Sequence, residues 1–358
     1  MSECTALSKN LTSPLALPWT DLSPLAAKLT KKLWVSPQEF LTVTHAGVIA
    51  EWAIHASQVW QPRLPAGIRR GPKQVYRDSS VLILALVHVA WQMTYEESVD
   101  YFRAHPEAAR TAGFPTGRGI SIGQYWVRRR NLGSIPFWLF FIGMVGQLVR
   151  MAVITGTDVI LDATTQKIWF HEDPEAGWSF PKPGKGSVWG YKVHTVLCRW
   201  SELPVMFLIT SANRQELLLA IPLLMATVLC YGFSISLVRA DAGYFTYPIL
   251  NFIREVLKAG FVIDYNLRRK GKRFVATLFF LWQWRFAMRP RAAIERHYAW
   301  AKRYFGLEAG RWRGLVAAYQ HTALVYSVML GVALVAHRYQ RPELMGSRSS
   351  VLACKTLG

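Results

Sequence analysis

The sequence predicts an α/β fold in which a mixed five-stranded sheet is flanked by helices and preceded by an all-helical region. Two observations support this prediction. From residue 157 onward, short runs rich in β-branched residues alternate with apolar helical stretches in the order β-β-β-α-β-α-β, and a further helix follows. Before residue 157 the apolar spacing is helical, and capping residues and prolines mark the ends of successive helices.

Composition limits the class of protein. The 358 residues are 51% hydrophobic and 18% charged, enough to bury a sizeable core in two modest domains. The formal net charge of +20 favours a polyanionic partner, nucleic acid first and an anionic membrane surface second. The four cysteines lie far apart without a C-x-x-C pair, which argues against a zinc site or a disulfide framework and fits a reducing cytosol. The N-terminus lacks the pattern of a signal peptide.

A membrane protein is the alternative that the hydropathy raises. The three richest apolar runs are Val81–Trp91, Ile135–Val149 and Ala323–Ala336. Each is shorter than the roughly 18 to 20 residues that a spanning helix requires. We therefore interpret them as buried core helices and expect no membrane partner.

Three helices are expected after a partly helical lead-in that covers residues 1–78. The first runs from Ser79 to Met93. Thr94-Tyr-Glu-Glu97 is a capping box that opens the second, which continues to about residue 104. Ser121 caps the third, which runs through Leu132. Three short helices with a basic last one are the outline of a helix-turn-helix DNA reader, so residues 79–150 are predicted to bind DNA.

The third helix supplies the predicted DNA contacts of this region through Arg128, Arg129 and Arg130. A run of charges on a helix is also what a solvated face contains, so a purely structural interpretation stays open.

The predicted strands and helices of the second half follow in order. Strands are expected at residues 158–163, 189–197, 203–211, 235–241 and 261–265. Helices are expected at residues 215–229, 247–259 and 291–302, and one or two more apolar helices at residues 314–336. The resulting division assigns residues 151–310 to a catalytic domain and residues 311–358 to C-terminal helices and a tail.

Three carboxylates are the candidate catalytic and metal-binding residues. Asp162 and Asp241 each end an apolar strand, and Glu295 lies on a later helix. Singly, such an aspartate often marks a turn. Together, three carboxylates from two strands and a helix can converge on one pocket, and hard oxygen ligands of this kind suit Mg²⁺. Two such ions can activate a water or a 3′-hydroxyl without any nucleophilic side chain.

The helix around Glu295 carries two cations on the same face. Successive helical residues turn by about 100°, so Glu295 lies about 40° and Lys302 about 20° from Arg291. One acid between two bases is common on a solvated helix. The more specific hypothesis is that Glu295 binds a metal ion and that Arg291 and Lys302 contact phosphates.

These motifs, in this order, resemble the DDE transposases of bacterial insertion sequences, whose catalytic domain is RNase H-like. The matching segments are Leu161-Asp-Ala-Thr-Thr165, Gly190-Tyr-Lys-Val-His194, Ala240-Asp-Ala-Gly-Tyr244 and the Arg291, Glu295, Lys302 set, which resembles the Tyr-Arg-Glu-Lys signature of that family.

The resemblance implies a DNA transposase that cleaves the ends of an element and joins them to target DNA. It implies that Asp162, Asp241 and Glu295 hold two Mg²⁺ ions, for which Mn²⁺ can substitute, and that Arg291 and Lys302 contact DNA phosphates. The implied partners are double-stranded DNA, both terminal inverted repeats and target, and a second copy of the chain in a synaptic homodimer. The implied location is the cytoplasm of a prokaryote, at the nucleoid.

Two departures from the family pattern leave open a decayed copy. Met288 stands where the signature has tyrosine, and Asn213-Arg-Gln-Glu216 replaces a frequent His-Asp pair, with Glu216 as the candidate replacement for that acid. The separation of Asp241 and Glu295, 295 − 241 = 54 residues, excludes a large inserted domain and resembles the compact members.

Further residues are candidates for DNA contact. Lys192 lies in a region that also holds Lys182, Lys185, Trp178 and Trp189, for which a solvated loop is the alternative. Trp282 and Trp284 lie where some relatives hold a base flipped out of a DNA hairpin, although core packing is favoured for at least one of them. His194 is interpreted as structural.

Two other functions remain compatible with the sequence. One is an RNase H-like metal-dependent nuclease that cuts without joining. The other is a non-catalytic DNA-binding protein derived from a transposase. The sequence does not indicate the terminal repeat, the target site or whether the copy is active.

Overall fold

The computed structural model describes residues 48–56, 76–114, 119–179, 186–264, 286–308 and 310–347. Two compact units divide the chain. Of the described residues, the sheet unit contains 145–302 and 308–318, and the helical unit contains the others. Each unit is treated by itself below.

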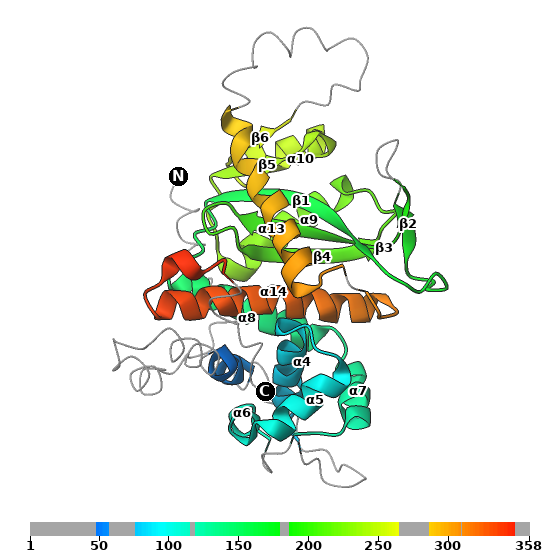
Figure 1. The fold of residues 1–358 in the computed structure, drawn as a ribbon. Coiled ribbons are helices and arrows are strands. Elements are labelled where there is room, and N and C mark those ends of the chain that lie inside the picture. The colour runs from blue at the N-terminus through cyan, green and yellow to red at the C-terminus, as the bar shows by residue number, and fades with distance from the viewer. Residues whose placement is uncertain are drawn as a thin grey trace, which may run out of the picture. The chain divides into compact units, whose positions relative to one another are not determined.

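A six-stranded mixed sheet forms the centre of the sheet unit (Figure 1). The order is β2-β3-β1-β5-β6, and β4 also pairs with β3. β1 and β3 are antiparallel, as are β3 and β4, whereas β5 and β6 run parallel to β1. The strands are β1 (Asp158–Lys167), β2 (Gly177–Ser179), β3 (Val188–Cys198), β4 (Pro204–Ser211), β5 (Leu237–Ala240) and β6 (Gly260–Ile263).

The predicted fold class, a mixed sheet flanked by helices after an all-helical region, is confirmed. The strand count differs by one, because the three-residue β2 pairs with the start of β3 beside the five expected strands. Three residues are too few to show an alternating pattern, so only pairing with β3 reveals this strand. β1 also continues to Lys167, four residues beyond the prediction, where its pairing with β3 goes on to Gly190.

Helices lie on both faces of this sheet. Figure 1 shows α13 (Ala292–Phe305) crossing in front of the strands and α9 (Leu217–Tyr231) behind them. A buried cluster joins α13 to the sheet: Ile160, Leu197, Ala293, Ile294 and Tyr298. The smaller elements of the unit are 3₁₀ turns at Ala242–Tyr244 and Arg289–Arg291, α10 (Tyr247–Asn251) and a π-helical turn at Phe252–Val256.

The helical unit confirms the three predicted N-terminal helices. α4 (Asp78–Ala90) is almost wholly buried, and the Thr94–Glu97 capping box opens α5 (Tyr95–Ala104). Ser121 caps α7 (Ile122–Asn131) by accepting a hydrogen bond from the Gln124 amide. The remaining described helical elements lie wholly or partly in this unit. They are residues 48–56, α6 (Pro106–Thr111), α8 (Ile135–Arg150), α14 (Leu315–Arg338) and a 3₁₀ turn at Pro342–Leu344.

One described helix, α14, is long and apolar enough to cross a membrane by length and composition. It has 24 residues, because helical structure extends on both sides of the apolar run at residues 323–336. Its most apolar window is 72% buried within the protein. A core helix of a soluble protein has the same properties, so this helix is weak evidence for a membrane. The α7–α8 pair passes the same test only if its 80° bend is ignored.

Candidate active site

Asp162 lies on the central strand β1, paired with Thr195 of β3. Its side chain is 15% exposed, and one carboxylate oxygen accepts a hydrogen bond from the Ala163 amide at 2.8 Å. Burial, with smaller contributions from the charges of Asp241 and Glu216, raises the pKa of Asp162 to about 7, against the lowering effects of the Ala163 amide and Arg291. A cation at this point would relieve an unfavourable concentration of negative charge.

Asp241 follows β5, the parallel neighbour of β1. Leu161 pairs with Ala240, so Asp162 and Asp241 come one residue later on adjacent strands. Asp241 also begins the 3₁₀ turn at 242–244, where its carboxylate accepts a hydrogen bond from the Gly243 amide at 2.8 Å. The sheet register therefore brings the two predicted aspartates together.

Glu295 approaches Asp162 through a shared arginine. The Arg291 guanidinium donates a hydrogen bond to Glu295 at 2.8 Å and lies 3.5 Å from the Asp162 carboxylate. Arg291 ends the 3₁₀ turn just before α13, and its side chain lies on the same side as Glu295, as the sequence predicted. The Glu295 side chain is 62% exposed. Its ion-pair partner among the described residues is this arginine, which links it to Asp162.

Lys302 does not join that group. Its ammonium pairs with Glu308 at 3.3 Å. The angular argument places Lys302 on the correct side of α13, but it is seven residues, or about 10 Å, along the axis from Glu295. Glu308, just after the end of the helix, is the partner in reach.

Lys192 is engaged beside the aspartates rather than free to meet DNA. Its ammonium pairs with Glu216 at 3.1 Å and donates to the Arg214 carbonyl at 3.1 Å. Glu216 is a fourth carboxylate near Asp162, and its charge also helps raise the pKa of the buried Tyr244 hydroxyl. The only sequence signal for Glu216 was its place where the family pattern has an acid.

His194 has the structural role expected of it. Its ring is 1% exposed and lies 3.0 Å from the Thr210 hydroxyl. Burial, and then the charge of Lys192, lower its pKa to about 4. The imidazole is therefore neutral at physiological pH.

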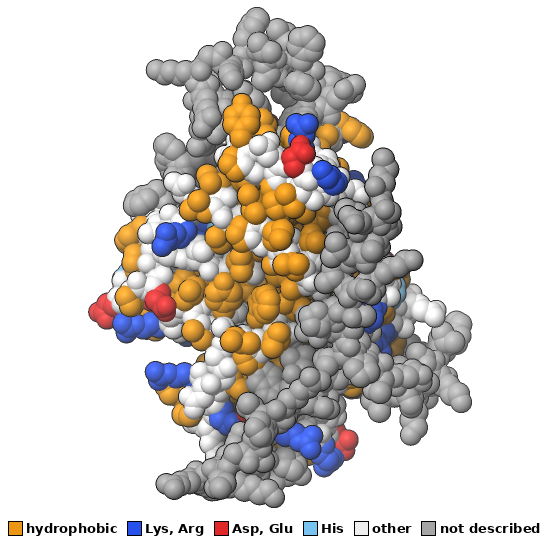
Figure 2. Space-filling model, turned by 180° about the vertical axis from the view of Figure 1, so that it is seen from behind, with side chains coloured by type: hydrophobic (Ala, Val, Ile, Leu, Met, Phe, Trp, Pro, Cys, Tyr) orange, Lys and Arg blue, Asp and Glu red, His pale blue; other side chains and the backbone are white. Residues whose placement is uncertain are grey.

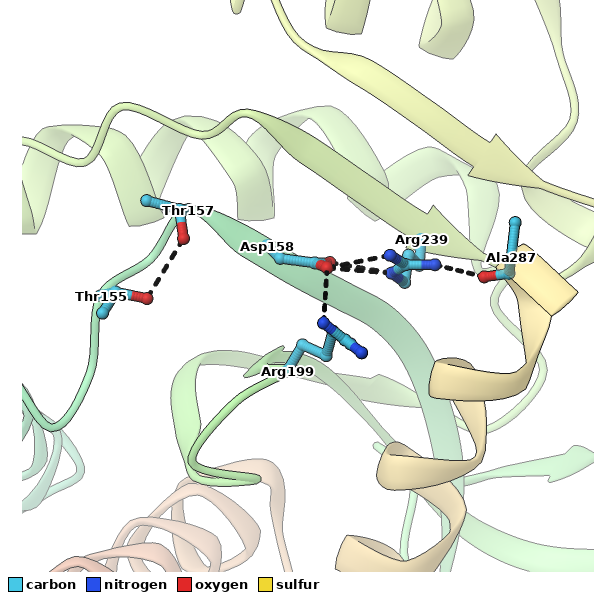
Figure 3. A network of polar contacts seen from close by, with 6 residues as sticks. All are labelled: Thr155, Thr157, Asp158, Arg199, Arg239 and Ala287. Atoms are coloured by element: carbon cyan, nitrogen blue, oxygen red, sulfur yellow. Dashed lines mark hydrogen bonds and ion pairs between the residues drawn. The ribbon is translucent and has the colours of Figure 1, made fainter.

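A buried ion pair that the sequence analysis missed holds the start of β1 (Figure 3). Arg239 of β5 donates two hydrogen bonds to Asp158, each at 2.9 Å, and a third guanidinium nitrogen bonds the Ala287 carbonyl. Arg199 lies 3.6 Å from the same carboxylate. This network ties β1 and β5 to the segment that leads into α13. A charged residue inside each of two apolar strands was the available signal.

In the helical unit, two of the three candidate arginines of α7 have partners inside the protein. Arg128 pairs with Asp78 and donates to the Tyr76 carbonyl. Arg129 is 8% exposed, and its guanidinium lies 5.5 Å from the centre of the Tyr95 ring. Arg130 is exposed and lies over the Trp126 ring. Arg130 is therefore accessible to a ligand, whereas Arg128 and Arg129 are engaged within the protein. Trp282, Trp284, Lys182 and Lys185 lie outside the described residues.

Within the described ranges, no three carboxylate, histidine or cysteine side chains stand close enough to hold a metal ion. The residues present nevertheless fit one in kind. Asp162 and Asp241 offer hard oxygen ligands on adjacent strands, and Arg291 shows that a cation is accommodated between Asp162 and Glu295.

A comparison with protein families matches residues 155–330 to the model described as "Transposase DDE domain". No curated protein matches the chain. A solved structure of the piggyBac transposase synaptic complex with hairpin DNA is similar at a TM-score of 0.48 and 10% identity, over 92% of this chain and 79% of that chain. That likeness is too slight to support a statement about this protein.

The matched family region contains all six strands of the sheet, the three candidate acids and Arg291. Sheet order, adjacent aspartates and family model thus agree. Residues 155–330 of this chain therefore match the transposase DDE domain family.

Proposed function

We propose that this protein is the DNA transposase of an insertion sequence, which cleaves DNA at the ends of its element and joins the freed ends to target DNA. The observation that carries the proposal is the adjacency of Asp162 and Asp241 on parallel strands inside a transposase DDE domain. Arg291, from the turn before α13, lies against Asp162, and it is paired with Glu295 of α13, which completes the set.

Divalent metal ions are general in this family, and we propose Mg²⁺ as the physiological one, two ions per site, with Mn²⁺ as a substitute. Asp162, Asp241 and Glu295 would hold them. When bound, the metals supply Lewis acidity toward a phosphodiester and lower the pKa of an attacking water or 3′-hydroxyl.

The protein's own groups would position the DNA. Arg291 would exchange its carboxylate partners for a phosphate, and Lys302 would do the same from its surface pair with Glu308. Tyr298 would keep α13 in place by its hydrogen bond to the Asp162 carbonyl. Asp162, which is largely shielded from water, would lose its proton as the cations bind.

Double-stranded DNA, as terminal inverted repeats and as target, is the proposed partner. The net charge of +20 supports this choice, because cations on the protein release counterions from DNA. Arg130 is the proposed contact on α7. Joining two ends requires both to be held at once, so we propose a homodimer in the synaptic complex. A prokaryotic cytoplasm, at the nucleoid, would be the location.

A strand-transfer assay tests the proposal. A pre-cut element end and a supercoiled target plasmid should give joined product with Mg²⁺ or Mn²⁺. Asp162→Ala, Asp241→Ala and Glu295→Ala should each reduce joining by about 1000-fold or more, since each removes a charge that the transition state requires. Glu255→Ala, at an exposed surface pair, is the matched control.

The same assay separates the alternatives. Hydrolysis of the end without joined product would favour a nuclease. DNA binding with neither reaction, unchanged by the acid substitutions, would favour a non-catalytic DNA-binding protein. Calorimetric titration with Mn²⁺, on the wild type and on Asp241→Ala, should show metal binding that the substitution abolishes, with DNA present if the free protein binds none.

A further inference from the structure

α9 has an unusual composition for a surface helix. None of its 15 residues is charged, and the hydroxyl of Thr227 is buried and donates to the Leu223 carbonyl at 2.8 Å. A helix that is apolar all round is normally covered on all sides. In this structure the sheet covers one side only.

The inner side of α9 packs against β3 and β4 through Ala220, Leu223, Leu224 and Thr227. The outer side carries Leu218, Pro222, Met225 and Leu229. Leu218 is 56% exposed and Leu229 is 66% exposed. Pro222 is exposed, and Met225 is partly buried.

Exposed apolar side chains also occur on elements that follow α9 in the sheet unit. α10 lies beside α9, and Tyr247 is 74% exposed, while Val256 of the following turn is 60% exposed. The rear view of the molecule shows hydrophobic side chains gathered over a broad face with few charges (Figure 2). Contiguous apolar surface of this kind marks an interaction site.

The charge and spacing of the outer side indicate its partner. A DNA backbone requires cations, and α9 has none. The helix is about 22 Å long, too short to span a bilayer of about 30 Å. The four outer residues recur at intervals of four, three and four, which is the spacing of the seam between two paired helices. The spacing and the absence of charge on α9 favour an uncharged helix as the partner.

We propose that two copies of this chain pair through α9, antiparallel and about a two-fold axis. The four outer residues match themselves under that rotation, because positions 218 and 229, and positions 222 and 225, are placed symmetrically about the middle of the set. Leu218 meets Leu229 of the second copy, and Pro222 meets Met225 of the second copy. A two-fold interface requires one patch to match itself in this way.

The proposed interface lies away from α13, although Glu216, which comes directly before α9, is near Asp162. α9 lies behind the sheet and α13 in front of it, so a dimer through α9 leaves Arg291 and Glu295 uncovered (Figure 1). In the proposed function such a dimer would hold two element ends. Whether the copies pair and whether the protein transposes DNA are nevertheless separate measurements.

Sedimentation velocity on the full chain tests the proposal with charge substitutions. The wild type should be a dimer at micromolar concentration. Leu218→Glu with Leu229→Glu places like charges together and should weaken association at least 100-fold. Leu218→Glu with Leu229→Lys places opposite charges together across the two-fold axis and should restore association, which 1 M NaCl should weaken again. Ile135→Glu, at a helical position that is 68% exposed in the other unit, should leave the dimer intact.

Three outcomes would overturn the proposal: a monomeric wild type at about 100 µM, a dimer unaffected by the two glutamates, or equal association of the Glu/Glu and Glu/Lys variants. If the Glu/Glu variant has a lower melting temperature without a change in oligomeric state, another segment of the same chain covers the outer side of α9. Both double variants introduce two charges, so their comparison stays valid if each is somewhat destabilised. Mn²⁺ binding by the same variants shows whether a charge at position 218, two residues from Glu216, also disturbs the catalytic site.

Discussion

Tyr298 of α13 donates a hydrogen bond of 2.9 Å to the backbone carbonyl of Asp162 on β1. The two residues are 136 positions apart, and the bond joins the helix that carries Glu295 to the strand that carries the first aspartate. The tyrosine ring is also part of the buried cluster between α13 and the sheet. One side chain thus packs the helix and sets its position along the strand.

Tyr298→Phe should keep the packing and lose the hydrogen bond. We expect a loss of about 1 kcal/mol in the free energy of unfolding and a fall of about tenfold in single-turnover cleavage, since small displacements of a catalytic group are costly. Tyr247→Phe, whose side chain is 74% exposed, is the control. The positioning role would be wrong if stability fell and cleavage did not.

Arg239→Met should leave Asp158 buried with only the more distant Arg199. Breaking such a pair is expected to lower the free energy of unfolding by about 3–5 kcal/mol, measured by urea denaturation at constant m-value. The side chains of Asp158 and Arg239 are 10% and 8% exposed. Arg296→Met, which breaks an exposed pair with Glu202, should cost about 1 kcal/mol or less. Similar losses in the two variants would contradict the importance of the buried network.

His297 should make the protein less stable in mild acid. Burial lowers its pKa from 6.5 to about 3, so the folded state keeps it neutral. Below pH 6.5 the imidazole is protonated in the unfolded state but stays neutral in the folded state. The free energy of unfolding therefore decreases as pH falls through 6.5 toward 3. At pH 5 this amounts to about 2 kcal/mol relative to pH 8. His297→Gln should flatten the pH dependence of unfolding by that amount, whatever its effect at pH 8; an unchanged slope would refute the assignment.

Arg291→Gln should have opposite effects on the two ligands. The guanidinium neutralises Asp162 and Glu295, so its loss should strengthen Mn²⁺ binding in the absence of DNA by about 3–10-fold. DNA-end binding should weaken, because a phosphate contact is lost. Lys302→Gln removes the same charge from the pair with Glu308 and should leave Mn²⁺ binding unchanged. Calorimetric titration distinguishes the variants, and equal responses would argue against a shared cation position.

Local pattern was sufficient for much of the fold. The Thr94 capping box, the Ser121 cap and the strands that carry Asp162 and Asp241 depend on neighbours within a few residues. The three-residue β2 could not be predicted, because its pairing with β3 is its only signal. The Asp158–Arg239 pair was likewise missed, and the pairing of Glu216 with Lys192 was not predicted, since these partners are distant in sequence.

The sequence by itself determined the order of the elements, the family resemblance and the positions of two aspartates at the ends of apolar strands. Only the tertiary structure decided which charges are available. Arg128, Arg129, Lys192 and Lys302 all looked free to bind DNA, and each has a partner within the chain. The periodicity of a helix or strand in the sequence predicts only the direction in which a side chain leaves its own backbone. An ion pair depends on which group from elsewhere in the chain lies within about 4 Å, and that proximity exists only once the chain has folded.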